Sequence, residues 1–425
     1  MTLLEQMQKA KQASFRLAAT SLRQRNEVLY NIKKALEDNA DKIQSANKLD
    51  IDAAEKGNLA GSLKKRLALT EAKISSLVKG LEDLINFDDP LAAIDIKREL
   101  DEGLRLYRKR VPIGVVGIIF ESRPDALVQI SSLCLKSGNV AALKGGKEAL
   151  NTNRTLYELI VSAACKAGGE FRDTVHLIET REEIKQMLNM DKYIDLLIPR
   201  GSNSLVSYIK QNTKIPVLGH ADGICHLYID KKADLDRAVE LTFDSKCQYP
   251  AVCNAIETLL IHKDIAGAAL PKIISRLNNV ELRGCAKTRA LSLMKEAKEN
   301  DWSEEYNDLV LSIKIVSDIN EAVGHINNYG SHHTDSIDTD DEKAAEYFLN
   351  NVDSSSVLHN CSTRFADGFR YGFGAEVGIS TAKIHARGPV GLEGLTIYKY
   401  LLIGSGQTVA PYANGEKKFT HRDIS

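Results

Sequence analysis

Long apolar segments and a secretory leader are both missing from the sequence. The longest apolar stretches, such as Val111 to Phe120, reach only about half of the ~20 residues that a transmembrane helix needs. The N-terminal segment MTLLEQMQKAKQASFRLAAT mixes charges among its apolar residues and lacks the continuous apolar region and cleavage site of a signal peptide. We therefore expect a cytoplasmic protein that does not bind a membrane.

An excess of charge is also lacking. The chain has 56 Lys and Arg against 57 Asp and Glu, which gives a formal net charge of -1. No overall attraction to nucleic acid is therefore expected. The seven cysteines form an odd, widely spaced set without a C-x-x-C or Cys/His zinc pattern, so we expect reduced thiols and no bound metal.

Histidine offers no metal set either. His220 and His226 lie six residues apart in GHADGICH with one aspartate between them, a spacing that fits no common metal site. We interpret this segment as structural. The pair His332-His333 is predicted to lie in a loop that faces solvent.

The glycine fingerprint of a dinucleotide-binding turn is absent as well. After a predicted strand at 113–120 the chain reads FESRPD instead of G-x-G-x-x-G, so a cofactor would be held differently. At 425 residues the chain exceeds the size at which one hydrophobic core stops growing. Two or three structural units are expected.

The apolar pattern that is present predicts helices first and an alternating α/β series afterwards. Helices are expected over 21–36 and 67–85, followed by a protruding hairpin over 94–111. The series that follows predicts doubly wound parallel sheets, which bind ligands at the carboxyl ends of their strands. Expected strands are 113–120, 140–143, 174–178, 193–198, 215–218, 258–262, 309–315 and 396–403.

The segment LKGGKEA is the first that suits a chemical role. It places Lys144, Gly145 and Lys147 between a strand and a helix N-terminus, where backbone N–H groups favour phosphate or ribose oxygens. The alternative is an ordinary glycine turn with a solvated lysine.

Cys253 is the second such feature, because it follows a Tyr-Pro turn signal and precedes an apolar strand. This context indicates a thiol in a loop, although a buried cysteine can also act as a small hydrophobic residue. A third set, among glycines, could clamp a carboxylate or belong to a surface loop; it comprises Arg364, Arg370, Glu376 and Arg387.

Six segments taken together identify a family. They are IGVVGIIFESRPDALVQISSLCLKSGN, LKGGKEA, IPRGSNSLV, IPVLGHADGICHLYID, YPAVCNAIETLLIH and FRYGFGAEVGISTAKIHARGPVGLEGL. In these segments the chain resembles, nearly from end to end, the gamma-glutamyl phosphate reductases of the aldehyde dehydrogenase superfamily. The resemblance implies NADPH-dependent reduction of L-glutamyl 5-phosphate to L-glutamate 5-semialdehyde with release of phosphate, which is the second step of proline biosynthesis from glutamate.

The same resemblance implies roles for particular residues. Cys253 occupies the nucleophile position and would form a thioester, with Asn254 beside it in the catalytic set. Ser122 and the backbone N–H of Cys253 would stabilise negative charge on the carbonyl oxygen. Cofactor contacts are expected from Lys144, Gly145, Lys147, Gly201, Ser202 and Asp308, and substrate contacts from Arg123 and Arg364.

Two departures from the wider superfamily refine this expectation. Val217 stands where hydrolytic members have a glutamate base, so hydrolysis of a thioester is disfavoured. Lys147 replaces the acidic residue that contacts the adenosine ribose, which suits the 2′-phosphate of NADPH.

The family pattern also implies three units. These are a cofactor-binding α/β domain over 1–232, a catalytic α/β domain over 233–395, and an oligomerisation strand and tail over 396–425 that pairs with the hairpin. A homodimer or higher homo-oligomer is expected, since assembly would protect the exposed sheet edges. Glutamate 5-kinase is a hypothetical partner, because glutamyl phosphate cyclises readily.

Two rival interpretations remain at this point. One is a coenzyme-A-acylating or ordinary aldehyde dehydrogenase, which the missing glutamate and the ESRPD and GHADG segments disfavour. The other is a non-catalytic protein that binds the cofactor, which the retention of Cys253 and Lys144 disfavours.

Overall fold

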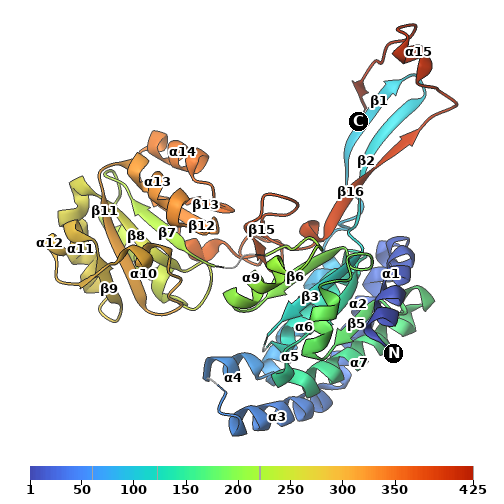
Figure 1. Cartoon of the computed structure of the whole chain (residues 1–425), viewed down its shortest axis with the longest axis horizontal. Helices are drawn as coiled ribbons and strands as arrows, with labels where there is room; N and C mark the ends of the chain where they lie inside the picture. The colour runs from blue at the N-terminus through green and yellow to red at the C-terminus, as the bar shows by residue number, and fades with distance from the viewer. Residues whose placement is uncertain (60, 122, 220–221, 425) are drawn as a thin grey trace.

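The computed structural model describes residues 1–59, 61–121, 123–219 and 222–424. Within these residues the chain forms two parallel α/β sheets and a separate antiparallel sheet that extends outward as an arm (Figure 1). The strand orders are β5-β4-β3-β6, β10-β9-β11-β8-β7-β12-β13 and β16-β2-β1-β17, and β14 and β15 form a small additional pair. The predicted mixed α/β class is therefore confirmed.

Five helices precede the first sheet, and each of the first two begins with a capping box. Thr2 and Glu5 cap one, and Ser21 and Gln24 cap the other, because each pair satisfies backbone N–H groups that the first helical turn leaves free. The helices are α1 (Leu3–Ala18), α2 (Leu22–Asp38), α3 (Ala40–Lys56), α4 (Gly61–Leu67) and α5 (Glu71–Asn86).

The first sheet reverses its strand order between β3 and β6, which makes that junction a topological switch point. Helices α1, α6, α7 and α9 contact its strands, and α2 and α5 pack against α6. Its elements are β3 (Val115–Phe120), α6 (Pro124–Lys136), β4 (Val140–Lys144), α7 (Leu150–Ala167), β5 (Val175–Ile178), α8 (Arg181–Met187), β6 (Leu196–Arg200) and α9 (Asn203–Gln211).

The second sheet begins at β7 and contains the loop that carries Cys253. Its elements are β7 (Cys225–Ile229), α10 (Leu235–Cys247), β8 (Ile256–His262), α11 (Lys263–Arg276), β9 (Glu281–Gly284), α12 (Ala286–Leu291), β10 (Lys295–Glu296), β11 (Val310–Val316), α13 (Ile319–Tyr329), β12 (Thr334–Asp338), α14 (Glu342–Asn351) and β13 (Ser356–His359). The short pair β14 (Ile379–Ser380) and β15 (Gly388–Pro389) follows.

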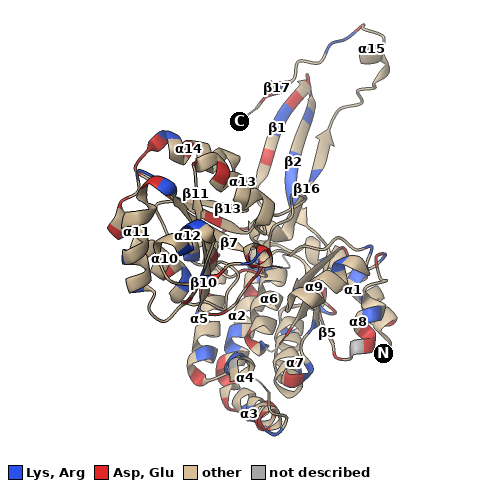
Figure 2. Cartoon of the chain, turned by 60° about the vertical axis from the view of Figure 1, so that its left-hand side comes forward, with Lys and Arg blue, Asp and Glu red and all other residues tan. Residues whose placement is uncertain are grey.

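The arm joins the predicted hairpin to the C-terminal strand. It consists of β1 (Ile94–Asp101), β2 (Leu104–Pro112), β16 (Thr396–Ile403), α15 (Ala410–Ala413) and β17 (Arg422–Asp423), with Gly103 in the turn at φ +73°. Basic and acidic residues are spread along β1 and β2 (Figure 2). Strand β16 pairs with β2 over its whole length, from Thr396 opposite Pro112 to Ile403 opposite Arg105.

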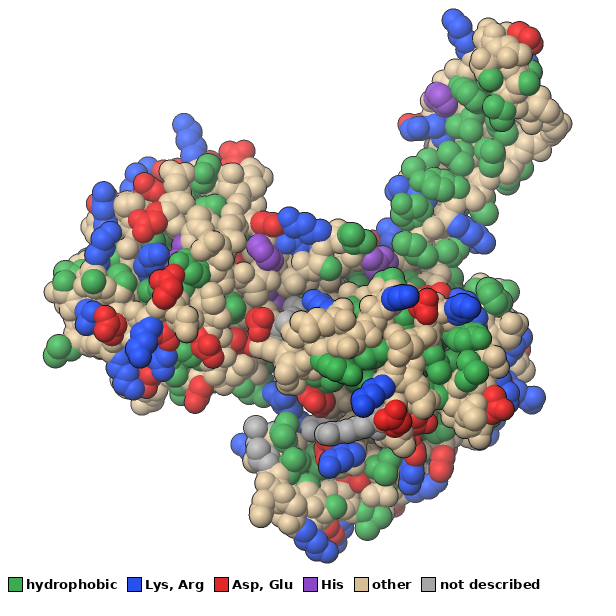
Figure 3. All heavy atoms as spheres, in the orientation of Figure 1, with side chains coloured by type: hydrophobic (Ala, Val, Ile, Leu, Met, Phe, Trp, Pro, Cys, Tyr) green, Lys and Arg blue, Asp and Glu red, His purple; other side chains and the backbone are tan. Residues whose placement is uncertain are grey.

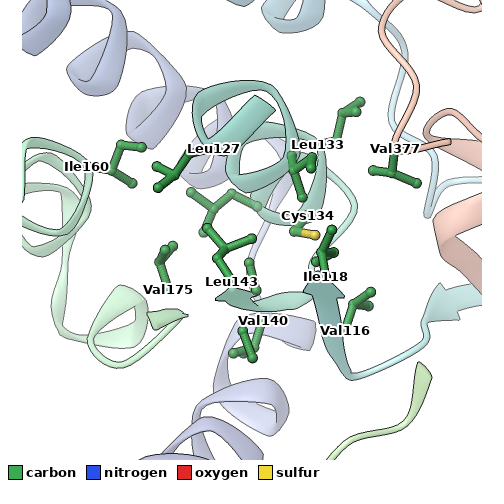
Figure 4. Close-up of a cluster of buried hydrophobic side chains, with 14 of the residues drawn as sticks. Val116, Ile118, Leu127, Leu133, Cys134, Val140, Leu143, Ile160, Val175 and Val377 are labelled. Carbon is green, nitrogen blue, oxygen red and sulfur yellow. The ribbon is translucent and has the colours of Figure 1, made fainter. Parts of the chain in front are cut away.

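The core of the first unit shows why its strands are almost continuously apolar. Every residue of β3 and β4 is buried, because helices cover both faces of a parallel sheet. Leu133 and Cys134 of α6 lie over Ile118 of β3, and Leu127 lies on the side of Ile160 of α7 (Figure 4). Residues from near the C-terminus complete this core, namely Val377, Val390 and Leu395.

Several predicted boundaries differ from the structure. Residues 67–70 precede α5, because Thr70 caps that helix. Residues 215–218 form no strand and contribute only a bridge between Val217 and Leu197. Because β7 pairs with β8, the sheet changes before residue 225 rather than at 233. His333, predicted to face solvent, is fully buried.

The described residues include neither a membrane-crossing helix nor a metal-binding group. None of their helices combines the length and apolarity that crossing a membrane requires. None of their His, Cys, Asp and Glu side chains gather in a set of three or more that could hold a metal ion.

A buried ion pair supports the start of β8. Lys246 donates to Glu257 at 2.5 Å, and the two side chains are 0% and 1% exposed. The backbone N–H of Asn307 also donates to Glu257, at 3.4 Å. Burial raises the pKa of Glu257 to about 7, against the opposing effect of Lys246.

We expect Glu257→Gln to destabilise the protein by about 3–5 kcal/mol, because it leaves the Lys246 ammonium buried without its charge partner. The double change Lys246→Met with Glu257→Leu should recover most of that loss. Urea unfolding at pH 8, above the pKa of Glu257, measures both. The exposed pair Lys272 and Asp236 supplies the control, since Lys272→Met should change stability by less than about 1 kcal/mol. Equal losses of unfolding free energy in Glu257→Gln and Lys272→Met would contradict a special role for the buried pair.

Candidate active site

Cys253 lies in the loop between α10 and β8, and close contacts with the start of β7 fix its backbone. The Cys253 carbonyl accepts a hydrogen bond from the Cys225 thiol, with a sulfur to oxygen distance of 3.1 Å. Gly223 packs directly against Cys253, and a β-carbon at Gly223 would lie only 2.6 Å from the β-carbon of Cys253. The predicted position of this thiol in a loop is confirmed.

Asn254 ties the same loop to a distant segment of the chain. Its side chain is buried, and Nδ2 donates to the carbonyl of Ala366 at 2.9 Å. Ala366 follows the short helix η4 (Thr363–Phe365), which contains Arg364. Asn254 therefore holds the loop that carries Cys253 against the segment that carries Arg364.

The surroundings of the Cys253 thiol favour its protonated form. Burial raises its pKa to about 12, and the nearby carboxylates of Glu305 and Glu376 act in the same direction. The guanidinium of Arg200 opposes them and lowers the pKa. The charge balance around the thiol therefore decides how readily it ionises.

Arg200 reaches this site from the carboxyl end of β6, beside the switch point of the first sheet. Its Nη1 donates to the backbone carbonyl of Glu376 at 3.3 Å. The carboxylate of Glu376 accepts from the backbone N–H of Gly368 at 3.0 Å, and burial raises its pKa. Sequence reasoning missed Arg200, although it stands in the segment IPRGSNSLV, two residues after the predicted strand 193–198.

The two arginines predicted to bind substrate approach from different elements. Arg123 precedes α6, has an exposed side chain and lies 3.7 Å from Asp125. Arg364 is buried, donates from Nε to Gln248 at 2.9 Å, and burial lowers its pKa. Its backbone carbonyl accepts from Arg370 at 2.6 Å. Arg387 does not join them, because it pairs with Asp353 at 3.0 Å.

The residues predicted for the cofactor, apart from Asp308, follow β4 and β6 at the carboxyl edge of the first sheet. Lys144 ends β4 and is buried, with its ammonium close to the carbonyl of Gly145. Lys147 is exposed on the following turn. At the end of β6, the backbone N–H of Ser202 donates to Glu121 at 3.1 Å. A lysine and two glycine-containing turns at this edge fit a dinucleotide, which parallel sheets bind there.

Glu305 is a further acidic residue that the sequence interpretation did not select. Its carboxylate accepts from Asn203 Nδ2 at 3.1 Å and raises the pKa of Cys253. Asp308, the acid that was selected, is exposed and accepts from the backbone N–H of Leu309 at 2.7 Å. Of Glu305 and Asp308, Glu305 is the acid whose charge acts on the thiol. Ser122 lies outside the described residues.

The candidate residues of the two sheets lie at opposite ends of their strands. Lys144 and Arg200 stand at carboxyl ends of strands in the first sheet, whereas Cys253 precedes the amino end of β8 in the second. The candidate site lies between these edges. A separate cavity of about 550 Å³ between α5 and α6 is lined by none of these residues.

A model of the aldehyde dehydrogenase family matches residues 2–290, which is more than half of the chain. The chain belongs to the aldehyde dehydrogenase family. The predicted enzyme class, an oxidoreductase of this family, is thereby confirmed.

Curated relatives of this family member extend the likeness over its whole length. Gamma-glutamyl phosphate reductase of Pelotomaculum thermopropionicum is 54% identical, with 100% of this chain and 98% of that protein covered. The protein of the same name from Acetivibrio thermocellus is also 54% identical, with 100% and 99% covered. The crystal structure of gamma-glutamyl phosphate reductase from Thermotoga maritima matches with a TM-score of 0.93 at 40% identity, over 96% of this chain and 99% of that one. The predicted family resemblance and fold are confirmed.

Replacing Gly223 with alanine should reduce activity at least about 100-fold, because the added methyl group would displace the Cys253 backbone. The loss of stability should stay within about 1–3 kcal/mol. Steady-state kinetics and thermal unfolding measure the two effects. Gly267→Ala is the matched control in the same unit, since a β-carbon there meets nothing within 4 Å. Full activity in Gly223→Ala would show that the tight packing against the nucleophile loop is not required.

Proposed function

We propose that the enzyme reduces L-glutamyl 5-phosphate to L-glutamate 5-semialdehyde with NADPH and releases phosphate, as the second step of proline biosynthesis from glutamate. The observation that carries this proposal is the setting of Cys253, which lies beside cationic side chains and next to an edge suited to a dinucleotide. The names of the full-length relatives support the choice of substrate.

Cys253 is the nucleophile in this proposal. Its thiolate attacks the acyl carbon, phosphate leaves, and a thioester to the enzyme remains. The pull of Arg200 on the thiol pKa favours ionisation, whereas Glu305 and Glu376 oppose it. When bound, NADPH would supply the hydride that reduces the thioester to the aldehyde.

The thioester must survive until it is reduced. Val217 supports this, because its apolar side chain cannot activate water and its backbone is fixed by the bridge to Leu197. The backbone N–H of Cys253 and Ser122 remain our proposed donors to the carbonyl oxygen in the transition state.

Cofactor binding is assigned to the carboxyl edge of the first sheet. Lys144, Gly145, Gly201 and Ser202 would contact the ribose and phosphate groups. Lys147, exposed at that edge, suits the 2′-phosphate of NADPH by charge. Glu305 is a stronger candidate than Asp308 for the nicotinamide ribose, because it binds Asn203 beside the end of β6 and its charge acts on the thiol.

Arg123 and Arg364 are our candidates for the α-carboxylate of glutamate. The buried Arg364 donates to Gln248, and Asn254 holds the neighbouring Ala366 in place. Arg364 therefore offers a fixed cation. Arg123 is exposed and can adjust to the substrate. A fixed and an adaptable guanidinium together suit a flexible amino-acid substrate.

The arm is proposed as the surface of a homo-oligomer. Apolar side chains are visible along it in the space-filling view (Figure 3), and Ile397, Tyr398, Tyr400, Leu402 and Ile403 of β16 are 39% to 58% exposed. Exposed apolar groups of this kind mark protein contacts. We place the enzyme in the cytoplasm, and contact with glutamate 5-kinase remains a hypothesis.

The proposed reaction is tested in reverse, because that direction avoids the labile acyl phosphate. With glutamate 5-semialdehyde and NADP, we expect activity that depends strictly on phosphate, exceeds that with NAD, and falls by more than about 1,000-fold in Cys253→Ala. Absorbance of the reduced cofactor measures the rate, and Cys165→Ala, an exposed thiol elsewhere, is the control. Activity without phosphate, or with coenzyme A instead, would reject the proposed function. Activity in Cys253→Ala would reject the thioester.

The assembly is tested by Tyr400→Asp together with Leu402→Asp, which should convert the oligomer to monomers because a buried charge opposes association. Light scattering after size exclusion measures the mass. The exposed Tyr208→Asp on α9 is the control. An unchanged mass would place the interface elsewhere.

A further inference from the structure

Three arginines from separate parts of the chain converge on the candidate site. Arg200 comes from the end of β6, Arg123 from the residue before α6, and Arg364 from η4. The charge of Arg123 acts on Arg200, and Cys253 interacts with both Arg200 and Arg364. The substrate of the proposed reaction carries two anionic groups at opposite ends of a short chain, so the arginines must divide between them.

We propose that Arg200 binds the phosphoryl group of the acyl phosphate, and inorganic phosphate in the reverse direction. This assignment rests on the proposed function and deepens it. Arg123 and Arg364 then remain for the α-carboxylate.

The first argument is the position of Arg200. The phosphoryl group is bonded through one oxygen to the carbon that Cys253 attacks, so its binding residue must adjoin the thiol. Arg200 donates to the carbonyl of Glu376 at 3.3 Å, and Asn254, the neighbour of Cys253, donates to the carbonyl of Ala366 at 2.9 Å, so both bind the segment 366–376. The charge of Arg200 also lowers the pKa of Cys253. Its backbone is fixed by pairing of β6 with β3, where Arg200 lies opposite Phe120, and by the hydrogen bond from the Glu121 N–H to its carbonyl at 3.3 Å.

The second argument is the unused donor capacity of Arg200. Within the described part of the chain the only hydrogen bond of its side chain goes to a carbonyl, that of Glu376, at 3.3 Å, and the side chain forms no ion pair with a carboxylate there. Burial and the charge of Arg123 lower the pKa of Arg200. A guanidinium in this state is stabilised by an anion, and its fork of N–H groups matches phosphate.

Glu376 is the charge that opposes this binding. Its carboxylate interacts with Arg200 and Arg123, and Asp125 also acts on Arg200. Burial already raises the pKa of Glu376, and the Gly368 N–H holds the carboxylate. An arriving phosphate therefore competes with a carboxyl that accepts a proton more readily than usual.

The chemical step balances with this assignment. A sulfur to carbon bond forms, the bond between the acyl carbon and the phosphate oxygen breaks, and the electron pair leaves with that oxygen. The thiol proton ends on the departing phosphate, which leaves as hydrogen phosphate. Arg200 neutralises the charge that grows on the phosphate as the bond breaks.

The experiment measures the KM values of the reverse reaction for phosphate, NADP and semialdehyde in Arg200→Gln and Arg200→Lys. We expect the KM for phosphate to rise at least about tenfold in Arg200→Gln and less in Arg200→Lys, with the other two changed less than about threefold. Arg276→Gln is the matched control, because Arg276 lies on α11 and forms an exposed ion pair with Glu240 of α10. A rise in the KM for semialdehyde with that for phosphate unchanged would overturn the assignment.

A second measurement is independent of turnover. Inorganic phosphate should slow the alkylation of Cys253 by iodoacetamide in the native protein, read by mass spectrometry of its peptide, and should not slow it in Arg200→Gln. Equal protection in both proteins would overturn the proposal. If phosphate protects the native protein but no phosphate-dependent oxidation of semialdehyde occurs, the proposed function fails while the phosphate site stands.

Discussion

The packing of Gly223 and Cys225 against the Cys253 backbone is the constraint on which the rest of the site depends. It fixes the thiol at the amino end of β8, next to the carboxyl edge of the other sheet. Every proposed role, from cofactor binding to phosphate binding, serves a reaction at that sulfur. The contact requires a glycine, because any side chain at position 223 would occupy the place of the nucleophile.

Electrostatics then sets the chemistry around this fixed thiol. Burial and the carboxylates of Glu305 and Glu376 hold its proton, and Arg200 weakens that hold. A thiol that stays protonated until substrate is bound is protected from unwanted reactions, because the thiolate is the reactive form. In the proposed mechanism, the site combines a protonated thiol with cations that act when an acyl phosphate is bound.

The sequence predicted much of this fold because its signals are local. Parallel strands such as 115–120 are continuously apolar, and the hairpin has its own turn at Gly103. The strand predicted at 215–218 was wrong because an apolar run next to a proline does not show whether it pairs. Cys253 was selected from its turn context and from the family resemblance, whereas Arg200 and Glu305 were not selected. Both are ordinary charged residues whose role follows from long-range packing that brings β6 and the 304–308 loop to the thiol.

The chain also crosses between its two α/β units more than once. After building the second sheet it returns, and Val377, Val390 and Leu395 fill gaps in the core of the first. The side chain of Asn139 likewise donates to the carbonyl of Leu395 at 2.7 Å. Strand β2 can pair with β16 only after β16 has been synthesised. On the ribosome, the first unit thus remains unfinished until nearly the entire polypeptide has emerged. Until Val377, Val390 and Leu395 arrive, part of the apolar core of this unit has no side chains to cover it.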